Sequence, residues 1–275
     1  MSISLTSHFK RALCASVLVV LASPSAWAVA VTWDGDTGTD WNTGTNWGAD
    51  VAPAPGDAVT IVDGALANQP SLGLGDSSTV GTVAITAGRL DVDGNLTSTG
   101  GVNVSGSGTL RIGLAGSVSG NVTSSGTLNA LGSIAGNLTL EGASVLQIRA
   151  AIGTTVDGFV NLGGALDLDL SGIDFSLDRV EFALITAQGF MGAFAPYEVA
   201  GLANNLTFTA STIQSGGFFI YQGVVERNRQ ELPEPATWLL LATALAAVLS
   251  MHTRRALRAG QWPWLRRVWA GRRPG

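Results

Sequence analysis

Short stretches of alternating apolar and polar residues recur along the middle of this chain. They include Val83-Ala84-Ile85, Leu90-Asp91-Val92, Val102-Asn103-Val104, Leu110-Arg111-Ile112, Leu138-Thr139-Leu140 and Val145-Leu146-Gln147-Ile148. A period of two puts successive side chains on opposite faces of a β-strand, so each stretch predicts a short strand with one apolar row. Glycine is abundant, with 36 residues, and weakens a helix by about 1 kcal/mol per position relative to alanine. The pattern therefore predicts an all-β body.

The predicted strands belong to a loose repeat. Gly94-Asn95-Leu96-Thr97 returns as residues 120–123 and 136–139 with small changes, and Ser107-Gly108-Thr109-Leu110 returns eighteen positions later as residues 125–128. Repeats of about twenty residues are typical of a parallel β-solenoid, and glycine and asparagine at its corners tolerate left-handed backbone angles. An antiparallel sandwich is the alternative, although clear two-residue hairpin turns are lacking. We expect solenoid repeats over residues 79–150.

The segments on either side differ in composition. Trp33, Trp41 and Trp47 precede the repeat, and residues 29–78 are expected to form an N-terminal tryptophan-rich cap over the first coil. The Asn46-Trp47 element and the turn at residues 55–57 resemble the opening of passenger-like β-solenoid domains in bacterial surface proteins. Stacking of these tryptophans on carbohydrate is an alternative use.

Large aromatic residues return after the repeat. Longer strands are expected at residues 180–186, 206–210 and 218–225, within a β-rich C-terminal cap spanning residues 151–226. Such a cap would cover strand edges that otherwise promote aggregation. A polar linker follows at residues 227–232.

The N-terminal region has the three parts of a secretory signal. Lys10 and Arg11 precede an apolar run at residues 15–22, and Ala26 and Ala28 provide the small residues that signal peptidase requires. We expect residues 1–28 to be a signal peptide cleaved after Ala28. An uncleaved anchor is the alternative, although the apolar run is short for a membrane span.

The C-terminal region also has three parts. Pro233, Glu234 and Pro235 precede an apolar run at residues 236–251, and three arginines follow: Arg254, Arg255 and Arg258. At about 1.5 Å per residue a helical run of this length reaches about 24 Å, and flanking basic residues can extend its effective span. The excess of arginine after the run predicts one C-terminal transmembrane helix with its far end in the cytoplasm.

This order of motif, apolar helix and arginine cluster resembles a PEP-CTERM sorting signal, here residues 233–258. The resemblance implies recognition by an exosortase in the inner membrane of a Gram-negative bacterium. It also implies export, temporary anchoring through the helix, and then release to the cell surface or the exterior. Residues 259–275, a basic tail containing Trp262, Trp264 and Trp269, extend beyond the usual end of such signals.

Charge and composition narrow the function of the body. Residues 29–232 carry six arginines and nineteen acidic residues, a net charge of −13, and contain no Cys, His or Lys. The negative charge disfavours nucleic acid as a partner. The missing residue types exclude the usual zinc sites, Ser-His-Asp and Cys-His catalysis, and lysine Schiff bases. We therefore expect no cofactor, no metal and no enzyme activity.

Two features leave rival functions open. The pairs Asp91/Asp93 and Asp167/Asp169 each project from one face of a strand, which could serve a carbohydrate-active β-helix enzyme, or simply be solvated. Residues 34–36 and 91–95 carry oxygen ligands with glycine, which could serve a calcium-dependent carbohydrate-binding module, although neither forms a complete loop.

We expect a non-catalytic surface or extracellular-matrix protein, structural or adhesive. The sorting-signal resemblance implies association with exopolysaccharide or biofilm.

Overall fold

The computed structural model describes residues 28–149, 152–171, 173–195 and 197–228. Within these ranges no helix is both long enough and apolar enough to cross a membrane. The predicted signal peptide, sorting signal, transmembrane helix and basic tail lie outside the described residues, apart from Ala28. The only described helix is a short 3-10 turn, η1 (Gly44–Asn46).

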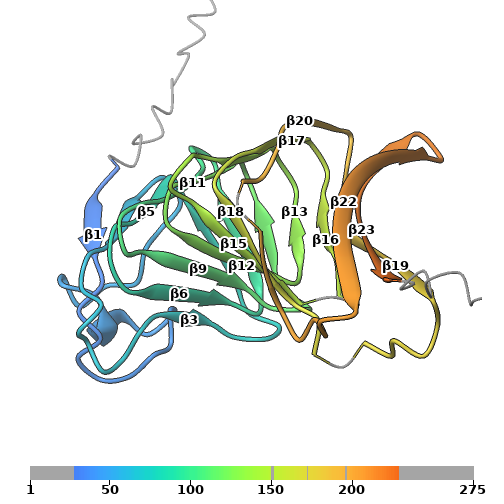
Figure 1. Cartoon of the computed structure of the whole chain (residues 1–275). Coiled ribbons are helices and arrows are strands. Elements are labelled where there is room, and N and C mark those ends of the chain that lie inside the picture. Colours follow the sequence, from blue (N-terminus) through green and yellow to red (C-terminus); the bar gives the residue numbers. More distant parts are fainter. Residues whose placement is uncertain (1–27, 150–151, 172, 196, 229–275) are drawn as a thin grey trace, which may run out of the picture. The chain divides into compact units, whose positions relative to one another are not determined.

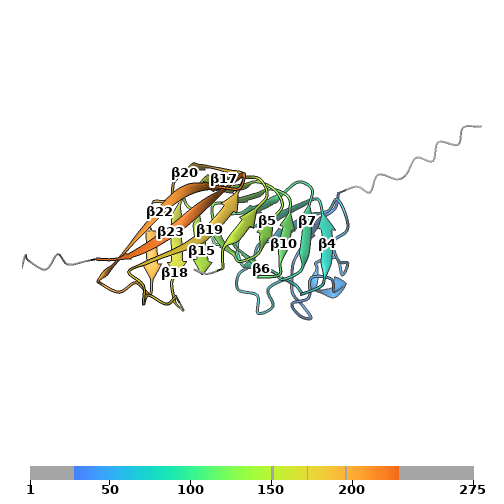
Figure 2. The ribbon, with the colours of Figure 1, turned by 90° about the vertical axis from the view of Figure 1, so that its right-hand side faces the viewer.

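Three sheets make up the body, and Figures 1 and 2 show their strands side by side. Sheet 1 contains β1 (Ala30–Thr32), β2 (Ala58–Ile61), β5 (Thr82–Ile85), β8 (Val102–Val104), β11 (Val122–Ser124), β14 (Leu138–Leu140), β17 (Phe159–Leu162) and β20 (Gly189–Gly192). Sheet 2 contains β3 (Ser71–Leu72), β6 (Arg89–Val92), β9 (Thr109–Ile112), β12 (Thr127–Ala130), β15 (Val145–Arg149), β18 (Ala165–Asp169) and β21 (Tyr197–Ala200). Sheet 3 contains β4 (Ser77–Val80), β7 (Asn95–Ser98), β10 (Ser117–Ser119), β13 (Ser133–Ile134), β16 (Thr154–Val156), β19 (Arg179–Ala187), β23 (Phe218–Arg227) and β22 (Leu206–Ser215).

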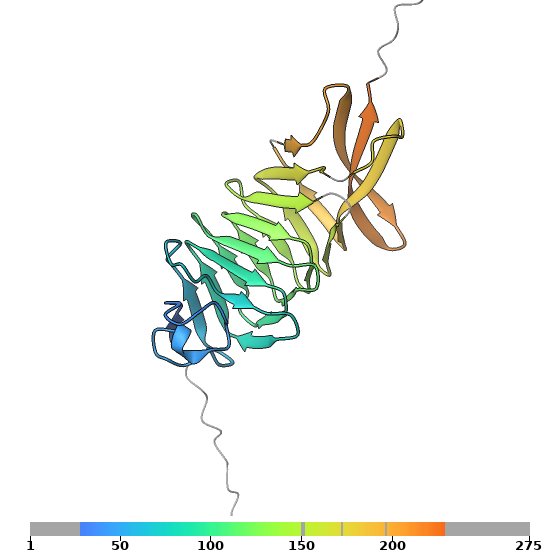
Figure 3. The ribbon, with the colours of Figure 1, turned by 90° about the horizontal axis from the view of Figure 1, so that it is seen from below.

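The chain visits the three sheets in turn and then begins the next coil. Val102 pairs in parallel with Val83 of the preceding coil and with Val122 of the following one. The structure is therefore a parallel β-solenoid of about six turns, and the antiparallel sandwich is excluded. Figure 3 shows the coils stacked in chain order from blue to yellow.

The stacked coils reach further in both directions than the repeat expected over residues 79–150. β2 already pairs in parallel with β5, and β17 pairs in parallel with β20. The distance along the chain between stacked residues also varies, from 16 residues between Val122 and Leu138 to 31 between Leu166 and Tyr197. The outer coils lack the Gly-Asn motif, so sequence similarity did not reveal them.

The core is a set of stacked inward-facing side chains. Five leucines, one per coil, form a continuous column in sheet 2 and are at most 1% exposed: Leu90, Leu110, Leu128, Leu146 and Leu166. Burying a leucine side chain contributes about 1.5–3 kcal/mol. A one-residue slip would turn the whole column outward, so this row fixes the register.

The asparagines of the repeat stabilise the corner before sheet 1. Asn121 Oδ1 accepts a hydrogen bond from the backbone N–H of Asn137 at 3.0 Å, and Asn137 Oδ1 accepts one from the N–H of Phe159 at 2.8 Å. None of these asparagines adopts a left-handed conformation, because Asp50 is the only described non-glycine residue with positive φ. Asn95 begins a strand of sheet 3 instead, so the three Gly-Asn units do not form one column.

The three tryptophans pack together at the N-terminal end of the described body. Trp33, Trp41 and Trp47 are at most 2% exposed, and Trp47 makes edge-on contacts with the other two at centroid distances of 4.9 and 4.8 Å. Each indole N–H donates to a protein oxygen at 2.8 Å. Buried Asn46 also has hydrogen-bond partners.

Long antiparallel strands end the body. β19 pairs in parallel with β16 on one side and antiparallel with β23 on the other. The predicted long strands correspond to β19, β22 and β23. Tyr221 is buried here against Phe190 and Phe194. A second, separate unit includes residues 204–207 and 227–228, in which the N–H of Asn228 donates to the carbonyl of Asn205 at 2.7 Å.

Candidate binding face on sheet 2

A column of polar side chains runs along the outward face of sheet 2. The parallel register stacks one residue from each strand, from β6 to β21: Asp91, Arg111, Asn129, Gln147, Asp167 and Glu198. The alternation along each strand produces this column, because residues beside the buried leucines must point outward. Successive members are separated by the strand spacing of about 4.8 Å.

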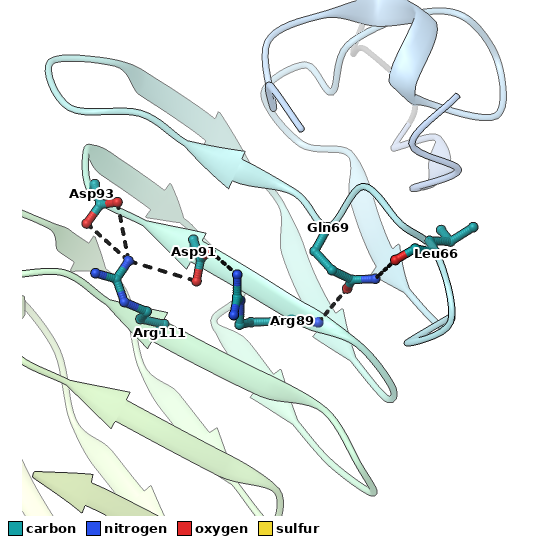
Figure 4. A network of polar contacts seen from close by, with 6 residues as sticks. All are labelled: Leu66, Gln69, Arg89, Asp91, Asp93 and Arg111. Atoms are coloured by element: carbon teal, nitrogen blue, oxygen red, sulfur yellow. Dashed lines mark hydrogen bonds and ion pairs between the residues drawn. The ribbon is translucent and has the colours of Figure 1, made fainter. Parts of the chain in front are cut away.

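Ion pairs neutralise the aspartates at the β6 end of the column (Figure 4). Arg89 Nη2 lies 2.8 Å from Asp91 Oδ2, while Arg111 Nη1 lies 3.3 Å from Asp93 Oδ2 and 3.9 Å from Asp91 Oδ1. Gln69 braces the same end, because its Oε1 accepts from the N–H of Arg89 at 2.7 Å while its Nε2 donates to Leu66 O at 2.9 Å. Asp91 and Asp93 thus share a face, as predicted.

The aspartates at the β18 end also have partners. Gln147 Nε2 donates to Asp167 Oδ2 at 3.0 Å, and Arg149 Nε lies 3.4 Å from Asp169 Oδ2. Hydrogen bonds from Ser171 to the Asp169 carboxylate, assisted by Arg149, hold the pKa of Asp169 below its ordinary value. Asp169 therefore stays ionised at neutral pH and is unsuited to be a general acid.

The comparisons with known proteins assign no family. No protein-family model matches the chain, and no curated protein matches it. The chemistry of this face must therefore be argued from its own residues.

An open groove lies between the polar column and the next outward column. Its volume is about 350 Å³, at the lower end of the range for ligand pockets. Arg111, Asn129, Gln147 and Asp167 come from the polar column, while Leu131, Arg149 and Asp169 come from the neighbouring one. Asn129 Oδ1 is buried without a hydrogen-bond partner.

The two aspartate pairs are far from each other. Asp91 and Asp167 are four strands apart in register, which corresponds to about 19 Å. Glycosidases place their two carboxyl groups about 5 to 9.5 Å apart. Residues from different pairs therefore cannot act together, and within each pair both carboxylates have polar or charged partners.

The proposed calcium ligands at residues 91–95 do not come together either. Asp93 faces Arg111 on sheet 2, whereas Asn95 lies on sheet 3 and its Oδ1 accepts from Ser117 Oγ at 2.7 Å. In the described ranges, no group of three or more Asp, Glu, His or Cys residues is arranged to hold a metal ion. Asp34 Oδ1, in the other suggested segment, is buried without a hydrogen-bond partner.

Stacking of the capping tryptophans on carbohydrate is excluded by their burial. The predicted processing residues Ala26, Pro233, Glu234, Pro235, Arg254, Arg255 and Arg258 lie outside the described residues. Sequence reasoning missed Asn129, Gln147 and Arg149 as parts of one face. Alignment of the two Ser-Gly-Thr-Leu units would have placed Asn129 beside Arg111, because each residue directly follows its unit.

Proposed function

We propose that this chain is an exported, membrane-targeted, non-catalytic surface or extracellular-matrix protein with a structural or adhesive role. The observation that carries the non-catalytic assignment is the pairing of all four predicted aspartates with arginine or glutamine side chains on sheet 2. Partners of this kind stabilise the ionised carboxylate and fix its position, which suits a scaffold better than proton transfer.

Export and anchoring are supported by the two terminal signals. In this proposal signal peptidase cleaves after Ala28, and an exosortase recognises Pro233-Glu234-Pro235 while residues 236–251 cross the inner membrane as a helix. Arg254, Arg255 and Arg258 hold the far end in the cytoplasm. Processing then delivers the body to the cell surface or to an exopolysaccharide matrix.

Substitution of Pro233 and Pro235 by alanine tests recognition of the motif. We expect the unprocessed chain to accumulate in the inner membrane, seen by fractionation and by the mass of the recovered protein. Pro55→Ala, within the N-terminal cap, is the matched control and should mature normally. Unchanged maturation of the Pro233/Pro235 variant would refute the sorting assignment.

Incubation with a panel of neutral and uronic-acid glycans tests the non-catalytic assignment. We expect no change in glycan chain length. Turnover by the unmodified protein that disappears in Asp91→Asn or Asp167→Asn would show an aspartate-dependent enzyme instead.

A further inference from the structure

The groove on sheet 2 presents hydrogen-bonding groups at a regular spacing. The polar column forms one wall of the groove. From β9 to β18 each coil contributes one side chain to this wall: Arg111, Asn129, Gln147 and then Asp167. Three strand steps give the groove a length of about 14 Å, and neighbouring outward columns lie about 6.7 Å apart. Its walls thus mix amide, guanidinium and carboxylate groups along a line.

We infer that this groove binds an extended, neutral polysaccharide, with the sugar chain lying across the strands. This inference rests on the proposed surface or matrix function and assigns its ligand class. The advance of each sugar in an extended chain is close to the strand spacing, so each coil can offer one hydrogen-bonding side chain to one sugar. Amide, carboxylate and guanidinium groups together can both donate to and accept from hydroxyl groups.

The charge of the face selects against other polymers. The outward side of β6 to β18, together with Asp93 directly after β6, carries three arginines and four aspartates. The arginines already contact aspartates. With a body of net charge −13, a polyanion would be repelled. A peptide strand would find few backbone partners here, because the groove lies on the face of a sheet whose strands pair on both sides.

The orphan amide oxygen also fits a groove that binds hydroxyl groups. Asn129 Oδ1 lacks a hydrogen-bond partner although the side chains above and below it in the column, Arg111 and Gln147, both carry N–H donors. A buried polar atom without a partner costs about 1–3 kcal/mol. A modest rotation of the Asn129 amide toward the groove would allow a ligand hydroxyl to satisfy this oxygen.

Affinity electrophoresis tests the inference with the full-length chain in a detergent whose head group is not a sugar. Gels contain hydroxyethylcellulose, laminarin or galactomannan as neutral probes, or alginate as a polyanion. We expect at least one neutral probe to retard the protein and alginate not to. Asn129→Ala combined with Gln147→Ala should weaken that binding at least tenfold.

The matched control is Asn103→Ala combined with Thr123→Ala. These residues line a different depression, on sheet 1, and should change binding less than twofold. If the sheet 2 double variant melts at a lower temperature than the unmodified chain, the single substitution Gln147→Ala replaces it and should still weaken binding severalfold.

Three outcomes overturn the inference: no binding to any neutral probe, equal loss in both double variants, or binding to alginate alone. Failure of the proposed function is distinguished by a separate measurement. A chain that is exported and processed normally but binds no neutral glycan loses only the ligand assignment. A chain found in the cytosol with both terminal signals intact loses the proposed function, whatever it binds in the gel.

Discussion

The amide oxygen of Asn121 accepts a hydrogen bond from the backbone N–H of Asn137, 16 residues later and one coil further along the stack. Asn137 repeats this contact with the N–H of Phe159 in the next coil. Two asparagines thus link three consecutive coils at one corner, which ties the loose Gly-Asn repeat of the sequence directly to the stability of the stack.

Substitution of Asn137 by alanine should destabilise the solenoid. The variant loses the bond that the N–H of Phe159 donates to the Asn137 amide oxygen, which contributes about 0.5–1.5 kcal/mol, whereas its own backbone N–H still donates to Asn121. The urea midpoint, followed by circular dichroism, should fall. Asn103→Ala, on the exposed middle of β8, is the control and should leave the midpoint unchanged. Equal midpoints for Asn137→Ala and the unmodified chain would show that the bond between Asn137 and Phe159 contributes nothing measurable.

Glycine at position 116 is required by close packing between coils. A Cβ atom there would lie 2.0 Å from the carbonyl oxygen of Val92, so Gly116→Ala must displace backbone. We expect a loss of about 1–3 kcal/mol in the free energy of unfolding. Gly142→Ala is the matched control, because a Cβ at that position meets nothing within 4 Å. If both variants unfold at the same urea concentration, the close approach is not maintained in solution.

Removal of Trp41 should uncover the first coil. Its side chain is fully buried, packs edge-on against Trp47 and donates to Ser78 Oγ. Trp41→Ala should therefore lower the free energy of unfolding by about 3–5 kcal/mol. Trp41→Phe keeps a ring but loses the hydrogen bond, so its melting temperature should lie between those of Trp41→Ala and the unmodified chain. A melting temperature for Trp41→Ala within one degree of the unmodified chain would contradict the capping role.

High pH should loosen the C-terminal end through Tyr221. Burial raises the pKa of Tyr221, and its hydrogen bond with Tyr197 at 3.1 Å acts in the same direction. The folded protein keeps this proton after the unfolded chain has begun to lose it near pH 10. The stabilisation is therefore complete below pH 10 and declines as the pH rises above it.

Urea midpoints at pH 8 and pH 11 measure this effect. The drop between the two values should be smaller for Tyr221→Phe, which has no proton to lose. Phe190→Leu serves as a control for the changed packing around Tyr221, and should show the same drop as the unmodified chain. An equal drop in the unmodified chain and Tyr221→Phe would exclude Tyr221 as the source.

The sequence by itself determined the local features. Alternation predicted the strands, glycine content disfavoured helices, and the spacing of residues 107–110 and 125–128 anticipated an observed register, Leu110 over Leu128. These inferences succeeded because side-chain direction in a strand depends only on parity along the chain. The aromatic content also predicted caps at both ends, since large apolar rings need a surface to cover, and that assignment stays a prediction.

Only the tertiary structure decided which residues meet across coils. Coil length varies, so no fixed period could place Asn129, Gln147 and Asp167 in one column or separate Asn95 from Asn121 and Asn137. The sequence position of each strand depends on the lengths of all the loops before it. Each irregular loop therefore displaces every later coil from a fixed sequence period. The groove on sheet 2 arises from that accumulated register, and only the pairing of Arg111 with Asn129 has a sequence signature, the repeated Ser-Gly-Thr-Leu unit.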